Sequence, residues 1–304
     1  MKTIVRLLIL LAVVLPFTLI RPDIPLEDLT ARYSDDRSRF VDIDEMPVHY
    51  KIEGTGPPLL LLHGTGASLH TWDAWTREMK GNFKVIRLDL PAFGLTGPTP
   101  DNTYSYEGYA RFLDRFVRRL QLNRFALAGN SLGGAISWHY ALAHPEKVTR
   151  LVLIDAGGYP GKSPPIFTLA RLPVLGRLIT VITPRFMVKK NLREVYGDPS
   201  RITSDLVDRY YDLLRRRGNR EAMLARIRTM EYSNHEAIRR VTTPTLILWG
   251  ESDRWIPVDN ARRFHNDIAG STLIVYPGLG HVPMEEAPRI TARDARSFLL
   301  SGQL

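Results

Sequence analysis

Short hydrophobic runs recur along the chain from residue 59 onward, each only a few residues long and separated by longer mixed segments. Continuous hydrophobicity over so few residues is typical of strands that are buried on both faces, as in a parallel sheet. Helical patterns lie between the runs, so the sequence predicts an α/β fold with a doubly wound, mostly parallel sheet. The predicted strands are Leu59–Leu62, Val85–Leu90, Phe125–Ala128, Leu151–Ile154, Leu246–Trp249 and Leu273–Tyr276.

The segment before residue 59 has a different pattern. Hydrophobic and polar residues alternate over residues 41–43 and 48–52, and Asp44-Glu45-Met46-Pro47 separates the two runs. Alternation with a period of two, interrupted by turn-forming residues, predicts a β-hairpin. Residues 21–38 are rich in Pro, Asp, Arg and Ser and are predicted to be a linker, which places the start of the main domain at residue 39.

Helical periodicity is clearest over residues 105–120, where apolar residues form one stripe and arginines the other face. A second helical region extends from Gly157 to about Arg240 and contains no convincing buried strand. Its patterns over 165–182 and 203–217 are interrupted by prolines. A block of this length is too long for a simple loop. We therefore expect a domain spanning 39–304 with a helical cap inserted at about 157–240.

The N-terminus has the pattern of a targeting segment. Lys2 and Arg6 precede an apolar run from Leu7 to Ile20, which resembles the core of a signal peptide, but no small-residue cleavage motif follows. We expect residues 1–20 to form an uncleaved membrane anchor or signal segment. The positive flank predicts a catalytic domain on the extracytoplasmic side of the membrane. The alternative is a buried N-terminal helix of a soluble protein.

Composition narrows the functional classes. The chain has 304 residues, of which 44% are hydrophobic and 24% charged, as in an ordinary globular protein with a sizeable core. It has no cysteine, which excludes disulfides, cysteine-ligated metals and thiol catalysis. The net charge is +9, but no zinc-finger, helix-turn-helix or RNA-recognition motif accompanies it, so we expect no nucleic-acid partner.

The pentapeptide Gly129-Asn130-Ser131-Leu132-Gly133 fits the pattern G-x-S-x-G. A predicted strand leads into it, and a helix-compatible stretch follows. In this context the pattern predicts a sharp strand-to-helix turn that presents the serine hydroxyl away from the backbone. Ser131 is therefore the expected nucleophile, and the amide of Leu132 is expected to face the developing oxyanion.

A serine nucleophile needs a base that is oriented by an acid. His281 follows the last predicted strand, and Asp253 follows the strand before it, in the chain order expected after Ser131. Both lie at the carboxyl ends of strands, where sites collect in open α/β sheets. Asp155 also ends a strand and is the rival acid. We favour Asp253 because its glycine-flanked turn suits a protruding side chain.

A second oxyanion donor is expected from the loop that follows the strand Leu59–Leu62. The loop begins His63-Gly64-Thr65-Gly66, and the best donor in it is the amide of Thr65. His63 is better explained as a buried residue that shapes the loop than as a base. Asp89 and Gly94 belong to the next strand end and are expected to shape the same mouth without a direct chemical role.

Together these motifs resemble the α/β-hydrolase superfamily, in order and in context. The resemblance covers about residues 40–300 and rests on five motifs. It implies an eight-stranded sheet, a Ser131–His281–Asp253 triad, and an oxyanion hole formed by the amides of Thr65 and Leu132. The motifs are His63-Gly64-Thr65-Gly66, Asp89-x-Pro-x-x-Gly94, Gly129-Asn-Ser-Leu-Gly-Gly134, Gly250-x-x-Asp253 and Gly280-His281.

The elbow sequence is similar to that of carbon–carbon bond hydrolases that act on ring-cleavage products. Those enzymes usually carry a tryptophan directly after the catalytic histidine and a longer glycine-rich oxyanion loop, whereas here Val282 follows His281. We therefore expect an esterase-like enzyme with a small-molecule ester or related carbonyl substrate and no metal or organic cofactor. The alternatives are carbon–carbon hydrolysis, perhydrolysis, or a non-catalytic binding protein on the same fold.

Overall fold

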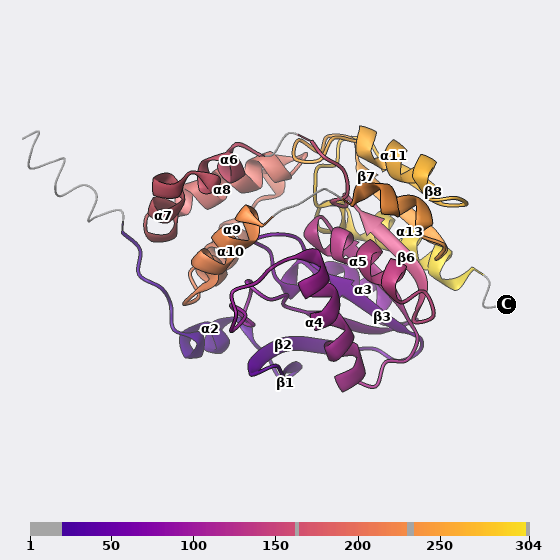
Figure 1. Ribbon diagram of the computed structural model, residues 1–304, viewed down its shortest axis with the longest axis horizontal. Helices are drawn as coiled ribbons and strands as arrows, with labels where there is room; N and C mark the ends of the chain where they lie inside the picture. Colours follow the sequence, from indigo (N-terminus) through magenta and orange to yellow (C-terminus); the bar gives the residue numbers. More distant parts are fainter. Residues whose placement is uncertain (1–19, 162–163, 230–233, 302–304) are drawn as a thin grey trace, which may run out of the picture.

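An eight-stranded sheet forms the centre of the protein, in the order β1-β2-β4-β3-β5-β6-β7-β8 (Figure 1). The computed structural model describes residues 20–161, 164–229 and 234–301. Neighbouring strands are parallel from β4 across β3, β5, β6 and β7 to β8, whereas β2 pairs antiparallel with both β1 and β4. The predicted α/β fold with a mostly parallel eight-stranded sheet is confirmed. The strands are β1 (Ser38–Ile43), β2 (Met46–Glu53), β3 (Pro58–Leu62), β4 (Lys84–Leu88), β5 (Phe125–Asn130), β6 (Val148–Ile154), β7 (Thr245–Gly250) and β8 (Thr272–Tyr276).

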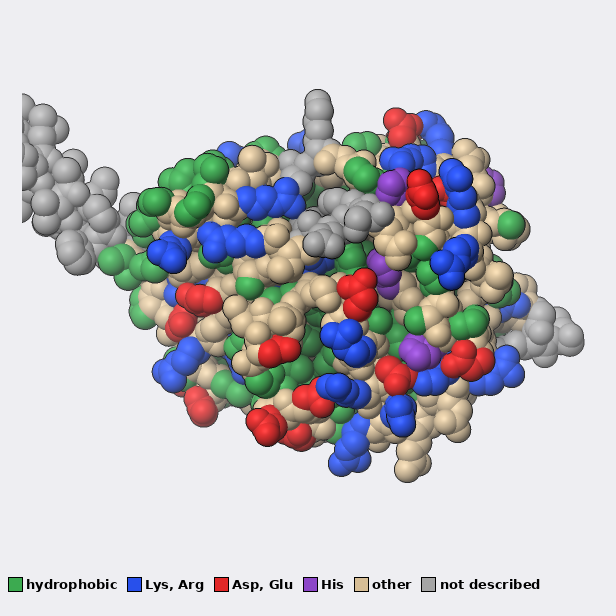
Figure 2. All heavy atoms as spheres, viewed as in Figure 1, with side chains coloured by type: hydrophobic (Ala, Val, Ile, Leu, Met, Phe, Trp, Pro, Cys, Tyr) green, Lys and Arg blue, Asp and Glu red, His purple; other side chains and the backbone are tan. Residues whose placement is uncertain are grey.

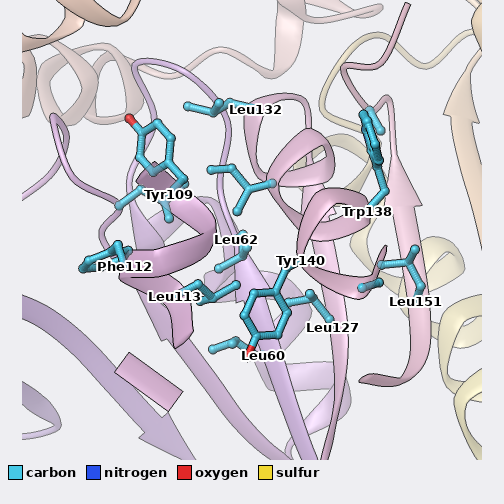
Figure 3. Packing of buried hydrophobic residues seen from close by; sticks show 14 of the residues in the cluster. Leu60, Leu62, Tyr109, Phe112, Leu113, Leu127, Leu132, Trp138, Tyr140 and Leu151 are labelled. Carbon is cyan, nitrogen blue, oxygen red and sulfur yellow. The ribbon is translucent and has the colours of Figure 1, made fainter. Parts of the chain in front are cut away.

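Alternating side chains of the central strands divide the core into two layers. Leu60 and Leu62 of β3 pack with the helices α4 (Tyr106–Arg119), α5 (Leu132–Ala143) and α11 (Asp259–Asp267). Figure 3 shows part of this layer, with Tyr109 and Leu113 of α4 close to the strand leucines. Leu59 and Leu61 face the other way, toward α3 (Asp73–Met79) and α13 (Pro288–Leu300). Both faces of the sheet are therefore covered, which explains the uninterrupted apolar runs.

The predicted hairpin is formed by β1 and β2, with a shorter turn than the sequence indicated. Asp44 and Glu45 both have positive φ angles, 54° and 63°, and the register closes at Ile43 opposite Met46. Two consecutive left-handed residues are the geometry of the tight turn that matches the twist of a hairpin. Met46 and Pro47 consequently belong to β2.

Helices connect β6 to β7, and none of the described residues between these strands belongs to a strand of the sheet. We call this region the helical segment; Figure 1 shows its helices gathered on one side of the molecule. Pro173 begins a new helix in the middle of the periodic stretch 165–182, because a proline is favourable at a first turn and not in a helix interior. The helices are α6 (Pro165–Arg171), α7 (Pro173–Val181), α8 (Arg185–Val195), η2 (Pro199–Arg201), α9 (Ser204–Leu214), α10 (Asn219–Arg228) and η3 (His235–Arg240).

Residues 21–38, predicted to be a linker, contain the helix α2 (Leu26–Tyr33) and are fixed to the helical segment. Leu29 is fully buried in a small cluster with Leu95 and Leu213. The amide of Ile24 donates to the carbonyl of Arg215 at 2.7 Å, and Arg220 forms an ion pair with Asp23 at 2.6 Å. Single anchoring residues such as these are spaced too widely to produce a periodic signal in the sequence.

The predicted membrane-anchored localisation is wrong. Across residues 20–161, 164–229 and 234–301, no helix is long and apolar enough to cross a membrane. The segment on which the prediction rested, residues 1–20, lies outside the described residues except for Ile20. Its apolar run, which begins at Leu7 and contains Pro16, is also shorter than the roughly 20 residues that a spanning helix needs.

Candidate active site

Ser131 occupies a strained turn between β5 and α5. Its φ and ψ angles are 53° and −113°, in a region that residues with a side chain rarely adopt. The turn is held by its neighbours: the amide of Ser131 donates to the carbonyl of Ile154 at 3.1 Å, and its own carbonyl accepts from Gly157 at 3.0 Å. The strand-to-helix context predicted from the sequence is present, with β5 ending at Asn130 and α5 beginning at Leu132.

The glycines on either side of Ser131 are required by close backbone packing. A Cβ atom on Gly129 would lie 2.2 Å from the carbonyl oxygen of Gly133, and one on Gly133 would lie 2.1 Å from that of Leu62. Each distance is far below van der Waals contact, and each obstacle is backbone rather than a movable side chain. Glycine is therefore needed at both positions, at Gly129 because of packing within the turn and at Gly133 because of packing against β3.

His281 and Asp253 form a buried pair next to this turn. The Nδ1 atom of His281 lies 2.6 Å from Oδ2 of Asp253, and both side chains are almost completely buried. The Oδ1 atom of Asp253 accepts from the amides of Trp255 and Ile256 at 2.7 and 2.9 Å. With both oxygens occupied, the carboxylate has a fixed orientation, and it leaves Nε2 as the free nitrogen of the imidazole ring.

The loop that carries His281 is also fixed from the serine turn. The Nδ2 atom of Asn130 donates to the carbonyl oxygen of His281 at 2.9 Å and to that of Ile154 at 3.2 Å. Asn130 directly precedes Ser131, so one side chain ties the serine turn to the histidine loop. The Ser131 hydroxyl and His281 form no hydrogen bond in the described part of the chain, and such bonds often tighten only when substrate is bound.

Asp155, the rival acid, lies beneath the His281–Asp253 pair. Its carboxyl group, that of Asp253 and the His281 ring all offer polar atoms within 4.8 Å of one another. The Oδ1 atom of Asp155 accepts from the amide of Gly250 at 3.0 Å, whereas Oδ2 is buried without a partner among the described residues. Burial and the adjacent Asp253 raise the pKa of Asp155 well above its ordinary value.

Three such donors could in principle hold a metal ion. Their hydrogen bonds indicate another use, because both oxygens of Asp253 and Nδ1 of His281 already have partners. A buried carboxylate that is held by backbone amides and bonded to Nδ1 of an imidazole is the arrangement that orients a general base.

The two predicted oxyanion donors have free amides. Leu132 is the first residue of α5, where a backbone N–H has no acceptor within its own helix. Thr65 lies in the loop after β3, and in the described part of the chain neither amide donates a hydrogen bond. Thr65 lines the same cavities as Ser131, and Leu132 lines one of them. The arrangement suits stabilisation of a negatively charged oxygen next to the serine.

Two cavities meet at the predicted catalytic residues. Both are lined by Ser131, His281 and Thr65, together with Phe167 and Trp255. The larger cavity, about 120 Å³, extends under the helical segment and is mainly apolar; its further lining includes Ile166, Ala170, Ile179, Val188, Leu192 and Ile227. The smaller cavity, about 70 Å³, extends toward Tyr106, Tyr159, Arg226 and Asn260. Trp255, which the sequence analysis did not single out, stands between them, 5.8 Å from the His281 ring.

Hydrophobic side chains are also exposed on the outer face of α6 and α7. Ile166 and Ile179, on α6 and α7, face the larger cavity, while other side chains of these helices point to solvent. Figure 2 shows the resulting group of hydrophobic side chains over α7. The exposed residues are Leu169, Leu172, Val174, Leu175, Leu178 and Val181.

Glu286 is a further residue that the sequence analysis missed. Its side chain is buried and accepts from the amides of Gly280, Gly197 and Asp198, at 2.7, 2.9 and 3.1 Å. Beside it, the amide of His281 donates to the carbonyl of Val195 at 2.7 Å. The histidine loop and the helical segment are therefore joined through backbone hydrogen bonds. A glutamate in a short helix after His281 carries no sequence signal of this role.

His63 and Asp89 hold the loops around the mouth of the site. His63 is fully buried, with Nδ1 2.8 Å from the carbonyl of Gly64 and Nε2 accepting from the amide of Leu90 at 2.9 Å. Burial lowers the pKa of His63, which is consistent with a neutral ring that bonds at both nitrogens. The carboxylate of Asp89 accepts from the amides of Leu69 and Leu95. Neither residue lines the two cavities.

Residues 59–294 of the chain match the sequence profile of the Alpha/beta hydrolase family. Among curated proteins, an uncharacterised hydrolase named YugF from Bacillus subtilis (strain 168) is 29% identical over 253 residues, which cover 83% of this chain and 92% of that protein. A 2-hydroxy-6-oxo-6-(2'-aminophenyl)hexa-2,4-dienoic acid hydrolase from Metapseudomonas resinovorans is 27% identical over 270 residues, covering 86% of this chain and 90% of its own.

A solved structure described as a serine hydrolase involved in carbazole degradation superposes with a TM-score of 0.76 at 26% sequence identity. The match covers 86% of this chain and 98% of that one. The matches therefore cover nine tenths or more of the length of each of these relatives.

Proposed function

The chain belongs to the alpha/beta hydrolase family, and we propose that within it the protein is a serine hydrolase that cleaves carboxylic esters. The observation that carries the proposal is the buried His281–Asp253 pair, joined at 2.6 Å, in which His281 lines the same cavity as Ser131. In this assignment Ser131 is the nucleophile, His281 the base and Asp253 the orienting acid.

The proposed reaction is acyl transfer to water. The Ser131 oxygen attacks the ester carbonyl while the Nε2 atom of His281 takes up the hydroxyl proton. The amides of Thr65 and Leu132 stabilise the oxyanion that forms. His281 then protonates the departing alcohol, and a water molecule, deprotonated by the same ring, releases the carboxylic acid and regenerates the serine. None of these steps calls for a metal or an organic cofactor.

We further propose that the helical segment, about residues 157–240, is a cap on a hydrolase domain that spans 39–304. Support comes from the larger cavity, whose walls are formed on one side by α6, α7 and α8 and on the other by strand-end loops. Its apolar lining suits a hydrocarbon portion of the substrate, so the cap would select the substrate and the strand ends would supply the chemistry.

Hydrolysis of a carbon–carbon bond in ring-cleavage products is the second candidate. It is favoured by the activity named for the relative from Metapseudomonas resinovorans, whose match covers 86% of this chain and 90% of that protein. Against it stand Val282, where such enzymes usually carry tryptophan, and the short loop after Thr65. We therefore place ester hydrolysis first.

A substrate panel distinguishes the candidates. Short 4-nitrophenyl esters and vinylogous 1,5-diketones would be offered to the wild type and to Ser131→Ala, with fluorophosphonate labelling of the serine as an independent readout. Ester hydrolysis that disappears in Ser131→Ala supports the proposal. If only the diketones are hydrolysed, the protein would be assigned to the carbon–carbon bond hydrolases. A protein that is inactive on all substrates and is not labelled would instead have a binding function.

A further inference from the structure

Arg226 on α10 is a buried cation without a counter-ion in the described part of the chain. Only 2% of the residue is exposed, and its Nε and Nη1 atoms are inaccessible and have no hydrogen-bond partner there. No carboxylate among the described residues forms an ion pair with it. The side chain lines the smaller cavity together with Ser131, Leu132 and His281.

A guanidinium group stays charged in proteins, and burying an unpaired charge is costly. Two aromatic rings compensate in part, because the Cζ atom of Arg226 lies 4.7 Å from the centre of the Tyr106 ring and 5.9 Å from that of Tyr109. Ring faces attract a cation but offer no acceptor for its N–H groups. A buried polar group that is left unsatisfied calls for an explanation, and a ligand that arrives from the cavity is one.

A second unpaired donor lines the same cavity. The Nε1 atom of Trp255 is buried and has no partner among the described residues. Neither Asp253, which is bound to His281, nor Asp155, whose Oδ1 atom accepts from the amide of Gly250, lines the smaller cavity. Glu107 lies in a neighbouring cavity with Tyr106 and His139 and forms no ion pair with Arg226. The smaller cavity thus offers a cation and an N–H donor but no charged acceptor.

We propose that the smaller cavity binds a carboxylate group of the substrate, with Arg226 as the charged partner and the indole N–H of Trp255 as a second donor. This inference rests on the proposed function, since it concerns the substrate that Ser131 attacks. The planar guanidinium group suits a planar carboxylate. With an apolar cavity on one side of Ser131 and this cavity on the other, the preferred ester has one hydrocarbon end and one anionic end.

The test uses two pairs of esters that differ by one charge. In the first pair the charge is on the acyl side: mono-4-nitrophenyl glutarate against 4-nitrophenyl pentanoate. In the second it is on the alcohol side: the butyryl ester of 4-hydroxybenzoate against that of its methyl ester. We expect the wild type to have a roughly ten- to hundredfold higher kcat/KM for the anionic member of one pair, the range that a charged hydrogen bond provides.

Three variants test whether Arg226 causes the preference for the anionic ester. Arg226→Gln is expected to lose this preference, chiefly through a higher KM for the anionic ester, while its rate with the neutral ester stays within about threefold of the wild type. Arg226→Lys should keep part of the preference because it keeps the charge. Arg228→Gln is the matched control, since Arg228 lies on the same helix but is exposed, and it should change neither rate.

Each outcome bears on one proposal only. A wild type that prefers the neutral member of both pairs, or an Arg226→Gln variant that slows both members equally, would overturn the carboxylate site and leave ester hydrolysis intact. If Arg226→Gln unfolds, Arg226→Lys decides instead: a folded Arg226→Lys variant that keeps the full wild-type preference for the anionic ester would overturn the carboxylate site equally. Absence of hydrolysis of all four esters, with no labelling of Ser131, would instead refute the proposed function.

Discussion

His281 and Asp253 are joined by the hydrogen bond at 2.6 Å between Nδ1 and Oδ2, and the other oxygen of Asp253 is held by two backbone amides. The carboxylate therefore determines which ring nitrogen carries the proton. In Asp253→Asn, the side-chain NH₂ can donate to Nδ1 and so favours the wrong tautomer of the imidazole.

We expect Asp253→Asn to lower kcat on a 4-nitrophenyl ester by roughly 10⁴-fold, as the equivalent change does in serine proteases. Steady-state kinetics would measure this, and circular dichroism would verify that the variant is folded. The exposed Asp259→Asn serves as the control and should retain the wild-type rate. A variant with more than a tenth of the wild-type kcat would show that Asp253 does not orient the base.

Asp155→Asn should have a different effect, because the raised pKa of Asp155 favours the neutral form of its carboxyl group over a wider range of pH. The pKa of Asp155 is raised by burial and by Asp253 above the value near 3.8 that it has in the unfolded chain. Above about pH 4 the folded protein therefore binds more protons than the unfolded chain. The free energy of unfolding consequently decreases as the pH rises from about 4 toward the raised pKa of Asp155. An amide cannot ionise and avoids that loss.

We predict that Asp155→Asn keeps at least a third of the wild-type kcat and makes the free energy of unfolding less dependent on pH above about 4. Urea unfolding at several pH values from 5 to 8 would measure the second effect. Asp155→Ala, which removes the acceptor for the Gly250 amide, should be less stable than Asp155→Asn. A strong loss of kcat in Asp155→Asn would instead make Asp155 an ionised partner of His281.

Gly133→Ala should damage the serine turn. Its new Cβ atom would lie 2.1 Å from the Leu62 carbonyl oxygen, so β3 or α5 must shift. We expect a loss of about 1–3 kcal/mol in the free energy of unfolding, the usual cost of overpacking, and a large loss of kcat because Ser131 moves with the helix. Gly81→Ala is the control: a Cβ there meets no atom within 4 Å, and stability should be unchanged or slightly raised.

Glu286→Ala would leave the buried amides of Gly280, Gly197 and Asp198 without their acceptor. An unsatisfied buried group costs about 1–3 kcal/mol, so the variant should unfold at clearly lower urea concentration. Because Gly280 precedes the base, kcat should fall as well. Exposed Glu251→Ala provides the comparison. Unchanged kcat in a destabilised Glu286→Ala protein would show that the loop geometry does not depend on this carboxylate.

His139 should contribute to the loss of folding stability at acidic pH. Burial lowers the pKa of His139 to about 4, whereas the unfolded chain titrates near 6.5. The stability that this neutral ring contributes is complete above about pH 6.5 and is lost as the pH falls toward 4, since the unfolded chain binds the proton first. Urea unfolding at pH 7 and pH 5 should show a smaller difference for His139→Gln than for the wild type. His265→Gln, at an exposed position, should leave the difference unchanged.

The sequence predicted the sheet well because buried parallel strands have continuous apolar runs, and it indicated candidate site residues because turn glycines and strand ends mark them. Ser131, Asp253 and His281 follow the parallel strands β5, β7 and β8, so all three lie at the same edge of the sheet. Glu286, Arg226 and Trp255 could not be found in this way. Their importance depends on which backbone amides, rings or cavities they reach after folding, and neither spacing nor composition encodes that.

The N-terminal region illustrates the opposite failure. A charged start and an apolar run indicated a membrane anchor, and proline-rich composition indicated a linker, yet α2 is fixed to α9 and to the loop after it. Composition describes average solvation, whereas one buried leucine and a few backbone hydrogen bonds are enough to dock a short segment.

The hydrogen bond from the amide of His281 to the carbonyl of Val195 has a kinetic consequence. If the whole helical segment moved outward to admit substrate, it would displace the loop that carries His281. The open protein would then be unable to catalyse the reaction. Substrate loading by small movements of α6 and α7, which lie farther from this bond in the chain, would avoid that penalty. The hydrogen bond at Val195 would then hold the His281 loop in its reactive position while substrate enters.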